Sequence, residues 1–413
     1  MRDGLKKLSC GSAATLLLAL AACGDDGAVR GDAGGDIDAA GLDGGGIRDT
    51  GVSVDAPPAG DSSIDSGGTD AGPPPRGDVV VYFTLSGDDE VAAYAMDAET
   101  GALTEQQRFS VDRNPGALAV SPGPEALYVA LRGTNSVGAY TIDPTSGMLS
   151  HVDDTVVGDN AVYLSVDATG ATLLWASYGG DRVASHRLAA DGSVMTARAS
   201  DFGTRTNPHC IVLDPSNAFA LVPNTNSDVI EQYLFDPATG ELTRNASREV
   251  TVPGGTGPRH LVFHPTLDLV YVVNEHADSV TLFDFDATAG TISEIETLST
   301  LPSGVGGGGN TCADIHVHPS GDFLYASNRG HDSIAIFTLD AEGRMTAAGH
   351  ADTEPTPREF GLDPFGEYLF AAGQGSGNVA SYRIEPGGSL TPLDVIAVGA
   401  APLWVEAIEL PGG

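Results

Sequence analysis

The sequence predicts an all-β fold, a seven-bladed β-propeller closed by its C-terminal strand. A pattern in the middle of the chain starts with Pro-Arg-His, runs through an apolar segment to His264-Pro265, and enters a second apolar segment ending at Asn274-Glu275. Similar stretches begin at Pro115, Ala161, Pro208, Pro258, Cys312, Pro357 and Pro402. A spacing of roughly 45 to 54 residues with four strand-sized segments is typical of propeller blades rather than of helical repeats.

Each repeat has the segments expected of one four-stranded blade. The first three segments alternate β-branched or aromatic residues with other types, which indicates strands. Turns that start with Asp and end with Gly separate the third segment from the fourth, for example at residues 97–101, 143–147 and 236–240. Asp favours the start of such turns, and Gly supplies the positive φ at their end.

The first repeat predicts how the ring closes. It begins at Val79 with a second strand and lacks a first one, whereas residues 402–408 form a spare first strand at the end of the chain. We therefore expect the C-terminal strand to complete the first blade. Such closure leaves no long exposed sheet edge.

Residues 1–22 are predicted to be a lipoprotein signal peptide. Basic residues precede a short apolar run at 13–22, which cannot span a bilayer. The run ends in LAAC, residues 20–23, which resembles a bacterial lipobox. We expect lipid on Cys23 and an exported bacterial lipoprotein, anchored to a membrane on the periplasmic side or at the cell surface. The alternative is an ordinary signal peptide followed by a chance cysteine.

The remaining chain divides into a linker and one folded domain. Residues 23–77 are rich in Asp and Gly and contain no aromatic residue, so we expect a disordered tether ahead of a propeller at residues 78–413. The chain has 56 acidic and 20 basic residues and a net charge of −36. Nucleic acid and anionic bilayers are therefore poor partners, and we expect a monomer that meets the membrane only through its lipid.

Four cysteines are present, and two of them fall in the predicted propeller. Cys10 leaves with the signal peptide, and Cys23 takes the lipid. Cys210 and Cys312 belong to blades that are not neighbours, so we expect buried free thiols rather than a disulfide.

Polar residues are predicted to gather at one mouth of the channel, because the start of strand one and the end of strand two lie on the same face. The ends of strand two carry Ser86, Arg132, Tyr178, Asn224, Glu275, Arg329 and Gln374. The starts of strand one carry Gly116, Val162, His209, Arg259, Ala313, Arg358 and Leu403. The blander alternative is that these are solvated strand ends.

This set of side chains predicts a site for an anionic substrate. Arginines that converge would repel one another unless a carboxylate or phosphate lies between them. We expect Glu275, assisted by His209, to activate water. Arg259, Arg329 and Arg358 are expected to hold the acid group and to stabilise the developing oxyanion. Substrate contacts are expected from Arg329, Arg358, Asn274, His260 and Gln374.

No metal or other cofactor is expected. His316 and His318 form an H-x-H pair, but no third ligand is evident from the sequence. His264 and His318 align with Asp214 and Asp363 at the turn after strand one, so we interpret both as turn residues on the opposite face.

At these residues the chain resembles the seven-bladed propeller lactonase family, which includes a bacterial 6-phosphogluconolactonase and fungal carboxy-muconate lactonising enzymes. The matching motifs are GPRHLVFHP with YVVNE, IHVHPSGDFLYASNRGHDSI, and PREFGLDPFGEYLFAAGQ. The resemblance covers residues 78–413 and implies lactone chemistry around Arg259, Glu275, His209 and Arg329. Enzymes of that family are typically cytosolic, so for an exported chain we expect the reaction type to be kept and the substrate to differ.

Three functions are therefore considered. The first is metal-independent hydrolysis of a sugar-acid or related lactone. The second is a surface propeller that binds a ligand or protein at the same rim without turnover. The third is a cycloisomerase that works in the lactone-forming direction. A fold shared by many activities does not decide among them.

Overall fold

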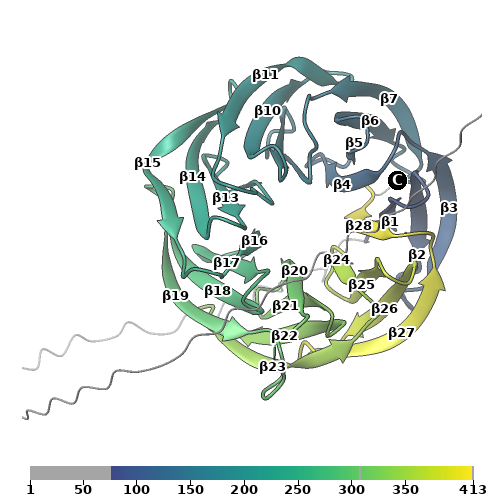
Figure 1. Ribbon diagram of the computed structural model, residues 1–413. Helices are drawn as coiled ribbons and strands as arrows, with labels where there is room; N and C mark the ends of the chain where they lie inside the picture. Colours follow the sequence, from purple (N-terminus) through teal and green to yellow (C-terminus); the bar gives the residue numbers. More distant parts are fainter. Residues whose placement is uncertain (1–75, 307, 412–413) are drawn as a thin grey trace, which may run out of the picture. The chain divides into compact units, whose positions relative to one another are not determined.

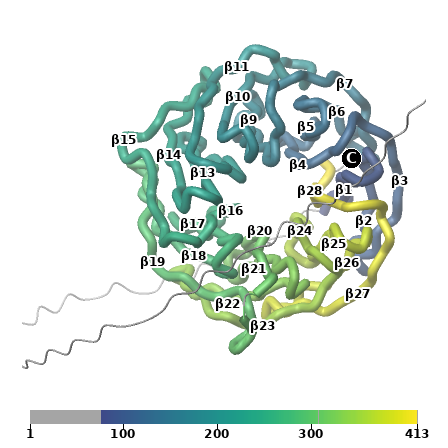
Figure 2. The backbone as a smooth tube through the Cα atoms, viewed as in Figure 1, coloured from purple at the N-terminus to yellow at the C-terminus, as the bar shows by residue number. Residues whose placement is uncertain are grey.

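A computed structural model describes residues 76–411, apart from residue 307. These residues form 28 strands and no helix, and the strands make seven antiparallel sheets of four. The sheets are arranged in a ring around a central axis (Figure 1), and the backbone trace follows the same ring (Figure 2). The predicted seven-bladed, all-β fold is therefore confirmed. The predicted signal peptide, Cys23 and nearly all of the linker lie outside the described residues.

The strands of each blade follow one another from the channel to the rim. Blade one consists of β28 (Pro402–Glu409), β1 (Val79–Leu85), β2 (Glu90–Met96) and β3 (Leu103–Ser110). Blade two consists of β4 (Pro115–Val120), β5 (Ala126–Leu131), β6 (Ser136–Ile142) and β7 (Leu149–Val156). Blade three consists of β8 (Tyr163–Val166), β9 (Thr172–Ser177), β10 (Arg182–Leu188) and β11 (Val194–Gly203).

The other four blades repeat this order. Blade four consists of β12 (Val212–Leu213), β13 (Phe219–Asn224), β14 (Val229–Asp236) and β15 (Glu241–Thr251). Blade five consists of β16 (Pro258–Phe263), β17 (Leu269–Asn274), β18 (Ser279–Asp286) and β19 (Thr291–Ser299). Blade six consists of β20 (Thr311–Val317), β21 (Phe323–Arg329), β22 (Ser333–Leu339) and β23 (Met345–Asp352). Blade seven consists of β24 (Pro357–Leu362), β25 (Tyr368–Gly373), β26 (Asn378–Ile384) and β27 (Leu390–Ala397).

The ring closes as the sequence predicts. β28 pairs antiparallel with β1, from Val79 opposite Glu409 to Leu85 opposite Pro402. The last strand of the chain is thus the innermost strand of blade one. Together with β1 it joins the two ends of the propeller by main-chain hydrogen bonds, which protects the edge of both strands.

A tyrosine in the second strand of several blades joins that blade to the next. Tyr82 donates a hydrogen bond of 2.6 Å to the carbonyl of Gly147, and Tyr271 donates one of 2.6 Å to the carbonyl of Gly343. Both acceptors are glycines at positive φ in the turn between strands three and four. The aromatic rings are fully buried between the sheets, so each residue contributes apolar packing and one directional contact.

Two predictions about single residues are confirmed. Cys210 and Cys312 are buried free thiols. His264 and His318 are turn residues: His264 accepts a hydrogen bond at Nδ1 from the Leu267 amide, and His318 accepts one from the Ser320 amide. None of the described residues forms a helix long and apolar enough to cross a bilayer.

Candidate functional site

The innermost strands line the channel, and β-bulges place consecutive residues of some of these strands along it. The pairing register shifts between Pro258 and His260 in blade five, and between Pro357 and Glu359 in blade seven. Arg259 consequently lines a small cavity at the mouth, while His260 lines a larger cavity deeper in the channel. Bulges commonly redirect side chains in this way.

The mouth cavity brings together three of the residues that the sequence selects. Its lining contains His209, Arg259 and Arg358, and it also contains Arg132 from the end of strand two in blade two. Arg132 donates a hydrogen bond of 3.0 Å from Nε to Asn160. Three arginines therefore surround one small space, in a chain with only 20 basic residues.

Glu275 lies beside Arg259, which lines the mouth cavity, and beside the partly buried Arg329; Glu275 and Arg329 are not themselves among the lining residues. Glu275 Oε1 accepts a hydrogen bond of 2.6 Å from Arg329 Nη2, and its Oε2 lies 3.7 Å from Arg259 Nε. The Arg259 side chain is 0% exposed, against 12% for Arg329 and 18% for Glu275. Burial alone would raise the pKa of Glu275, but Arg259 and Arg329 outweigh it, and the pKa is lowered. The carboxylate is therefore ionised and partly accessible.

Arg358 differs from its neighbours because its guanidinium has no partner. Its side chain makes no hydrogen bond or ion pair with any residue that the structure describes. Burial, followed by the charge of Arg259, lowers the pKa of Arg358. An anion in the mouth would relieve this repulsion, since guanidinium groups bind carboxylate and phosphate oxygens in pairs.

A chain of hydrogen bonds runs inward from His209. Its Nδ1 lies 3.2 Å from Nε2 of His260, whose Nδ1 lies 3.0 Å from Oδ1 of Asp314. The other carboxylate oxygen of Asp314 lies 3.0 Å from Nε2 of His316. Burial, followed by Arg259, lowers the pKa of His209 well below its usual value, so its imidazole is neutral.

Of the other residues predicted to contact substrate, Asn274 has its side chain turned away from the cavity, while the contact of Gln374 stays a prediction. Asn274 is fully buried, and its Nδ2 donates to the hydroxyls of Ser279 and Thr281 in the neighbouring strand β18. Gln374 follows β25 and is not among the residues that line the mouth cavity. His260 contacts two residues of the mouth, His209 and Arg259, at 3.2 Å each.

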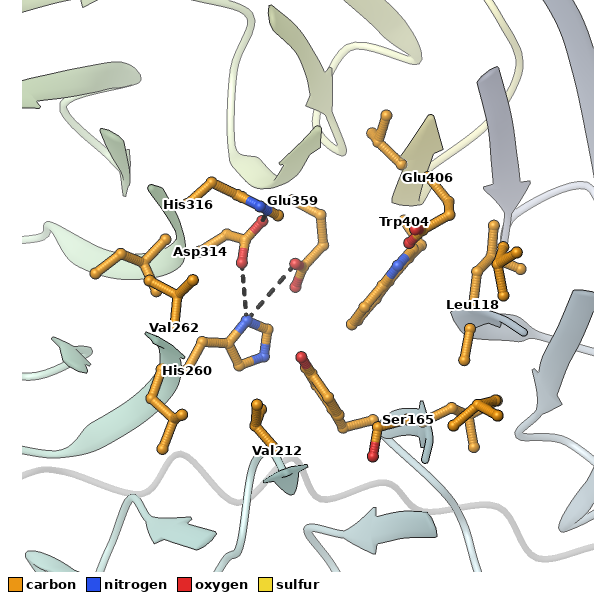
Figure 3. A pocket seen from close by; sticks show the side chains of 18 of the residues that line it. Leu118, Ser165, Val212, His260, Val262, Asp314, His316, Glu359, Trp404 and Glu406 are labelled. Atoms are coloured by element: carbon orange, nitrogen blue, oxygen red, sulfur yellow. Dashed lines mark hydrogen bonds and ion pairs between the residues drawn. The ribbon is translucent and has the colours of Figure 1, made fainter. Parts of the chain in front are cut away.

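Beyond the mouth, a cavity of about 480 Å³ occupies the channel. It extends along the innermost strands toward their C-terminal ends, between aliphatic residues and the rings of Tyr163 and Trp404. Asp314, Glu359 and Glu406 add carboxyl groups to its wall (Figure 3). Burial raises the pKa of Glu406 to about 7. We call this space the far cavity.

The sequence reasoning missed Glu359 and Glu406 and gave Asp314 no role at the site. All three lie on the innermost strands. Asp314 and Glu359 each follow directly after the strand-one residue predicted at the mouth, and Glu406 lies further along β28. A strict alternation of side chains places Glu359 away from the channel if Arg358 faces it. The available signal was the unusual run of charged residues, Arg358-Glu359, at the start of a strand that should be apolar.

Comparison with known proteins identifies the family. Residues 79–407 match the family described as "Lactonase, 7-bladed beta-propeller". A 6-phosphogluconolactonase of Pectobacterium carotovorum is 34% identical over 250 residues, which is 60% of this chain and 74% of that protein. A 6-phosphogluconolactonase of Yersinia enterocolitica is 32% identical over 251 residues, with the same coverage.

Solved structures agree on the fold. The periplasmic gluconolactonase of Pseudomonas aeruginosa superposes with a TM-score of 0.75 at 24% identity, covering 81% of this chain and 99% of that one. A protein from Lactobacillus plantarum superposes with a TM-score of 0.73 at 24% identity, covering 81% and 100%. At this identity the likeness concerns architecture. Taken with the match over residues 79–407, it shows that the chain belongs to the lactonase family of seven-bladed β-propellers.

Proposed function

We propose that the chain hydrolyses a lactone that carries an additional acid group, a carboxylate or a phosphate. The observation that carries the proposal is the unpartnered guanidinium of Arg358 in a cavity that also contains Arg132 and Arg259. Arg358 is partly buried, and a partly buried cation without a counterion is unfavourable, so an anionic group of the substrate is its natural partner. Homology to 6-phosphogluconolactonases supports lactone chemistry at this mouth.

Glu275 is proposed as the group that handles the proton of the attacking water. Its carboxylate is ionised and held by Arg259 and Arg329. The water oxygen forms a bond to the lactone carbonyl carbon while Glu275 accepts the proton. The ring carbon–oxygen bond then breaks, and the proton passes to the alkoxide, so the net change is the addition of one water. His209, neutral and close by, is proposed to assist.

Arg259 and Arg329 are proposed to stabilise the oxyanion. The Nε of each is buried and has no acceptor among the described residues. Donors fixed before the reaction stabilise charge that develops in the transition state without reorganisation. The product carries one more carboxylate than the substrate, which the same arginines would hold until release. These steps use protein groups and water, and we propose that they need no metal.

The test is acid release by the purified full chain from three sugar lactones. The panel contains a neutral aldonolactone, its phosphate ester and an aldarolactone with a free carboxylate, each with and without a chelator. We expect the two acidic lactones to be opened, with the same rate when chelator is present. If no lactone is opened while sugar acids still bind, the chain is a ligand-binding propeller instead.

We also propose that the protein is an exported lipoprotein, on the basis of residues 1–23 alone. Replacement of Cys23 by Ser removes the thiol that would carry the lipid. The wild-type chain should then be found in the membrane fraction and Cys23→Ser in the soluble fraction, because one lost anchor removes the main membrane affinity. Equal distribution of the two forms would contradict the proposal.

A further inference from the structure

We propose that His260, Asp314 and Glu359 form a binding site for one divalent transition-metal ion, of the Mn²⁺ or Zn²⁺ class, at the inner end of the far cavity. Each residue offers one donor atom, and the three donor atoms lie within 4.8 Å of one another. All three residues are buried. Their side chains converge on one point beside the open channel, as Figure 3 shows.

The spacing of the donor atoms suits a single ion. His260 Nδ1 lies 3.0 Å from Asp314 Oδ1 and 3.7 Å from Glu359 Oε2. Ligand atoms that bind one ion at ~2.1 Å are themselves roughly 3.0 to 3.5 Å apart in tetrahedral or octahedral geometry. Small rotations of the side chains would therefore place all three around one ion.

The carboxylate of Glu359 has an oxygen that the protein leaves without a donor. Its Oε1 accepts a hydrogen bond of 3.2 Å from Arg259 Nη2. Its Oε2 accepts no hydrogen bond from the residues that the structure describes, although the side chain is only 4% exposed. Glu359 lines the far cavity, and a cation bound there would supply the partner that Oε2 lacks.

Each of the three residues also contacts other protein groups that fix its orientation. His260 contacts His209 through Nε2, and Glu359 contacts Arg259. Asp314 Oδ2 lies 3.0 Å from His316 Nε2 and accepts a hydrogen bond from the Phe360 amide. Such contacts orient the ligands of metal sites and fix which imidazole nitrogen is free. With Nδ1 of His260 on the ion, its Nε2 would carry the proton and donate to His209.

The far cavity supplies what a metal site needs besides ligands. Its volume of about 480 Å³ gives an ion a path to the three residues and leaves the other coordination positions to water. One imidazole nitrogen with two carboxylate oxygens favours Mn²⁺ or Zn²⁺ over Ca²⁺ or Mg²⁺, which prefer oxygen ligands alone. Arg259 contacts both Glu359 and His260, at 3.2 Å each, but none of the three ligands has a step in the proposed hydrolysis, so the inference does not depend on it.

The direct test is metal binding by the full chain after dialysis against a chelator. Titration calorimetry with Mn²⁺ and with Zn²⁺, and elemental analysis after gel filtration, should give one tightly bound ion per chain. Glu359→Gln should weaken this binding about 100-fold or more, because it replaces a carboxyl ligand with an amide. Glu406→Gln, which changes a carboxyl group in the same cavity without touching the three ligands, should bind like the wild type.

A chain with a net charge of −36 attracts cations weakly over its whole surface. The comparison between variants distinguishes this nonspecific binding from binding at the proposed site, because only the latter should depend on Glu359. His316→Phe, which removes a contact behind Asp314, should weaken binding about 10- to 100-fold. Thermal unfolding without metal shows whether each variant is folded. Should Glu359→Gln fail to fold, the visible absorption of Co²⁺ bound to the wild type reports coordination directly.

Equal binding by wild type and folded Glu359→Gln would overturn the proposal, and so would the absence of a stoichiometric ion in the wild type. Chelator-resistant hydrolysis with a bound ion would support both this site and the proposed function. A bound ion without hydrolysis would support the site alone.

Discussion

Arg329 donates a hydrogen bond of 2.6 Å from Nη2 to Oε1 of Glu275, and its Nε remains buried without an acceptor among the described residues. Together with Arg259, the Arg329 guanidinium lowers the pKa of Glu275, and Arg329 Nε can still donate a hydrogen bond. Arg259 approaches the other carboxylate oxygen with its Nε, at 3.7 Å, and this Nε likewise has no hydrogen-bond acceptor among the described residues. These arginines therefore bind the Glu275 carboxylate and still have hydrogen-bond donors for a second anion.

Replacement of Glu275 by Gln should lower kcat for lactone opening by about 10² to 10⁴-fold, the usual contribution of a positioned proton acceptor. The amide keeps the size of the side chain but cannot accept a proton. Steady-state kinetics on an acidic lactone measures the effect. Binding of the product acid should persist or tighten in the variant, because Arg259 and Arg329 lose a competing carboxylate. A variant with the wild-type rate would rule out Glu275.

The pH dependence of hydrolysis follows from the lowered pKa of Glu275. The active form is the carboxylate, which persists above its pKa and is lost as the pH falls. Because Arg259 and Arg329 lower this pKa, kcat/KM should stay constant from neutral pH downward and fall only below the ordinary glutamate value of about 4.3. An acidic limb with its midpoint between pH 5 and 7 would contradict proton transfer by Glu275.

Arg358→Gln should raise KM for the acidic lactones about 10- to 100-fold, the worth of hydrogen bonds to a charged group. The neutral aldonolactone provides the control within the same protein, since it has no acid group to lose a partner. Its kinetic constants should change little. An equal loss for neutral and acidic lactones would mean that Arg358 supports the structure of the mouth rather than the acid group.

Tyr271→Phe should reduce the free energy of unfolding by about 1 kcal/mol, because the buried carbonyl of Gly343 loses its donor. Tyr128→Phe is the matched control, since Tyr128 is a buried tyrosine of another second strand whose hydroxyl bonds no described residue. Denaturant unfolding followed by circular dichroism compares the two. Equal destabilisation would show that the hydroxyl contact between blades contributes nothing.

The blade count and the closure of the ring could be predicted because they depend on strand order, which the repeats display directly. The spare strand at residues 402–408 needed one partner, and β1 was the strand without one. The gathering of His209, Arg259 and Arg358 followed from the same alignment. Repetition fixes which residue of each blade reaches the mouth.

The deeper channel could not be predicted, because it depends on backbone irregularities. The bulge near Pro357 turns both Arg358 and Glu359 toward the channel, which an alternating pattern does not foresee. Asn274 shows the opposite error. It precedes Glu275 in sequence, and neighbouring residues at the end of a strand point to opposite faces, so its amide bonds β18 instead of the mouth.

The pairing of β28 with β1 also sets the order of events during synthesis. β1 is made first and β28 last, so blade one stays incomplete until almost the whole chain has left the ribosome. Until then the inner edge of β1 exposes unpaired main-chain groups, which can pair with strands of other chains. A premature stop before residue 402 would therefore yield an open, aggregation-prone ring rather than a slightly shorter protein.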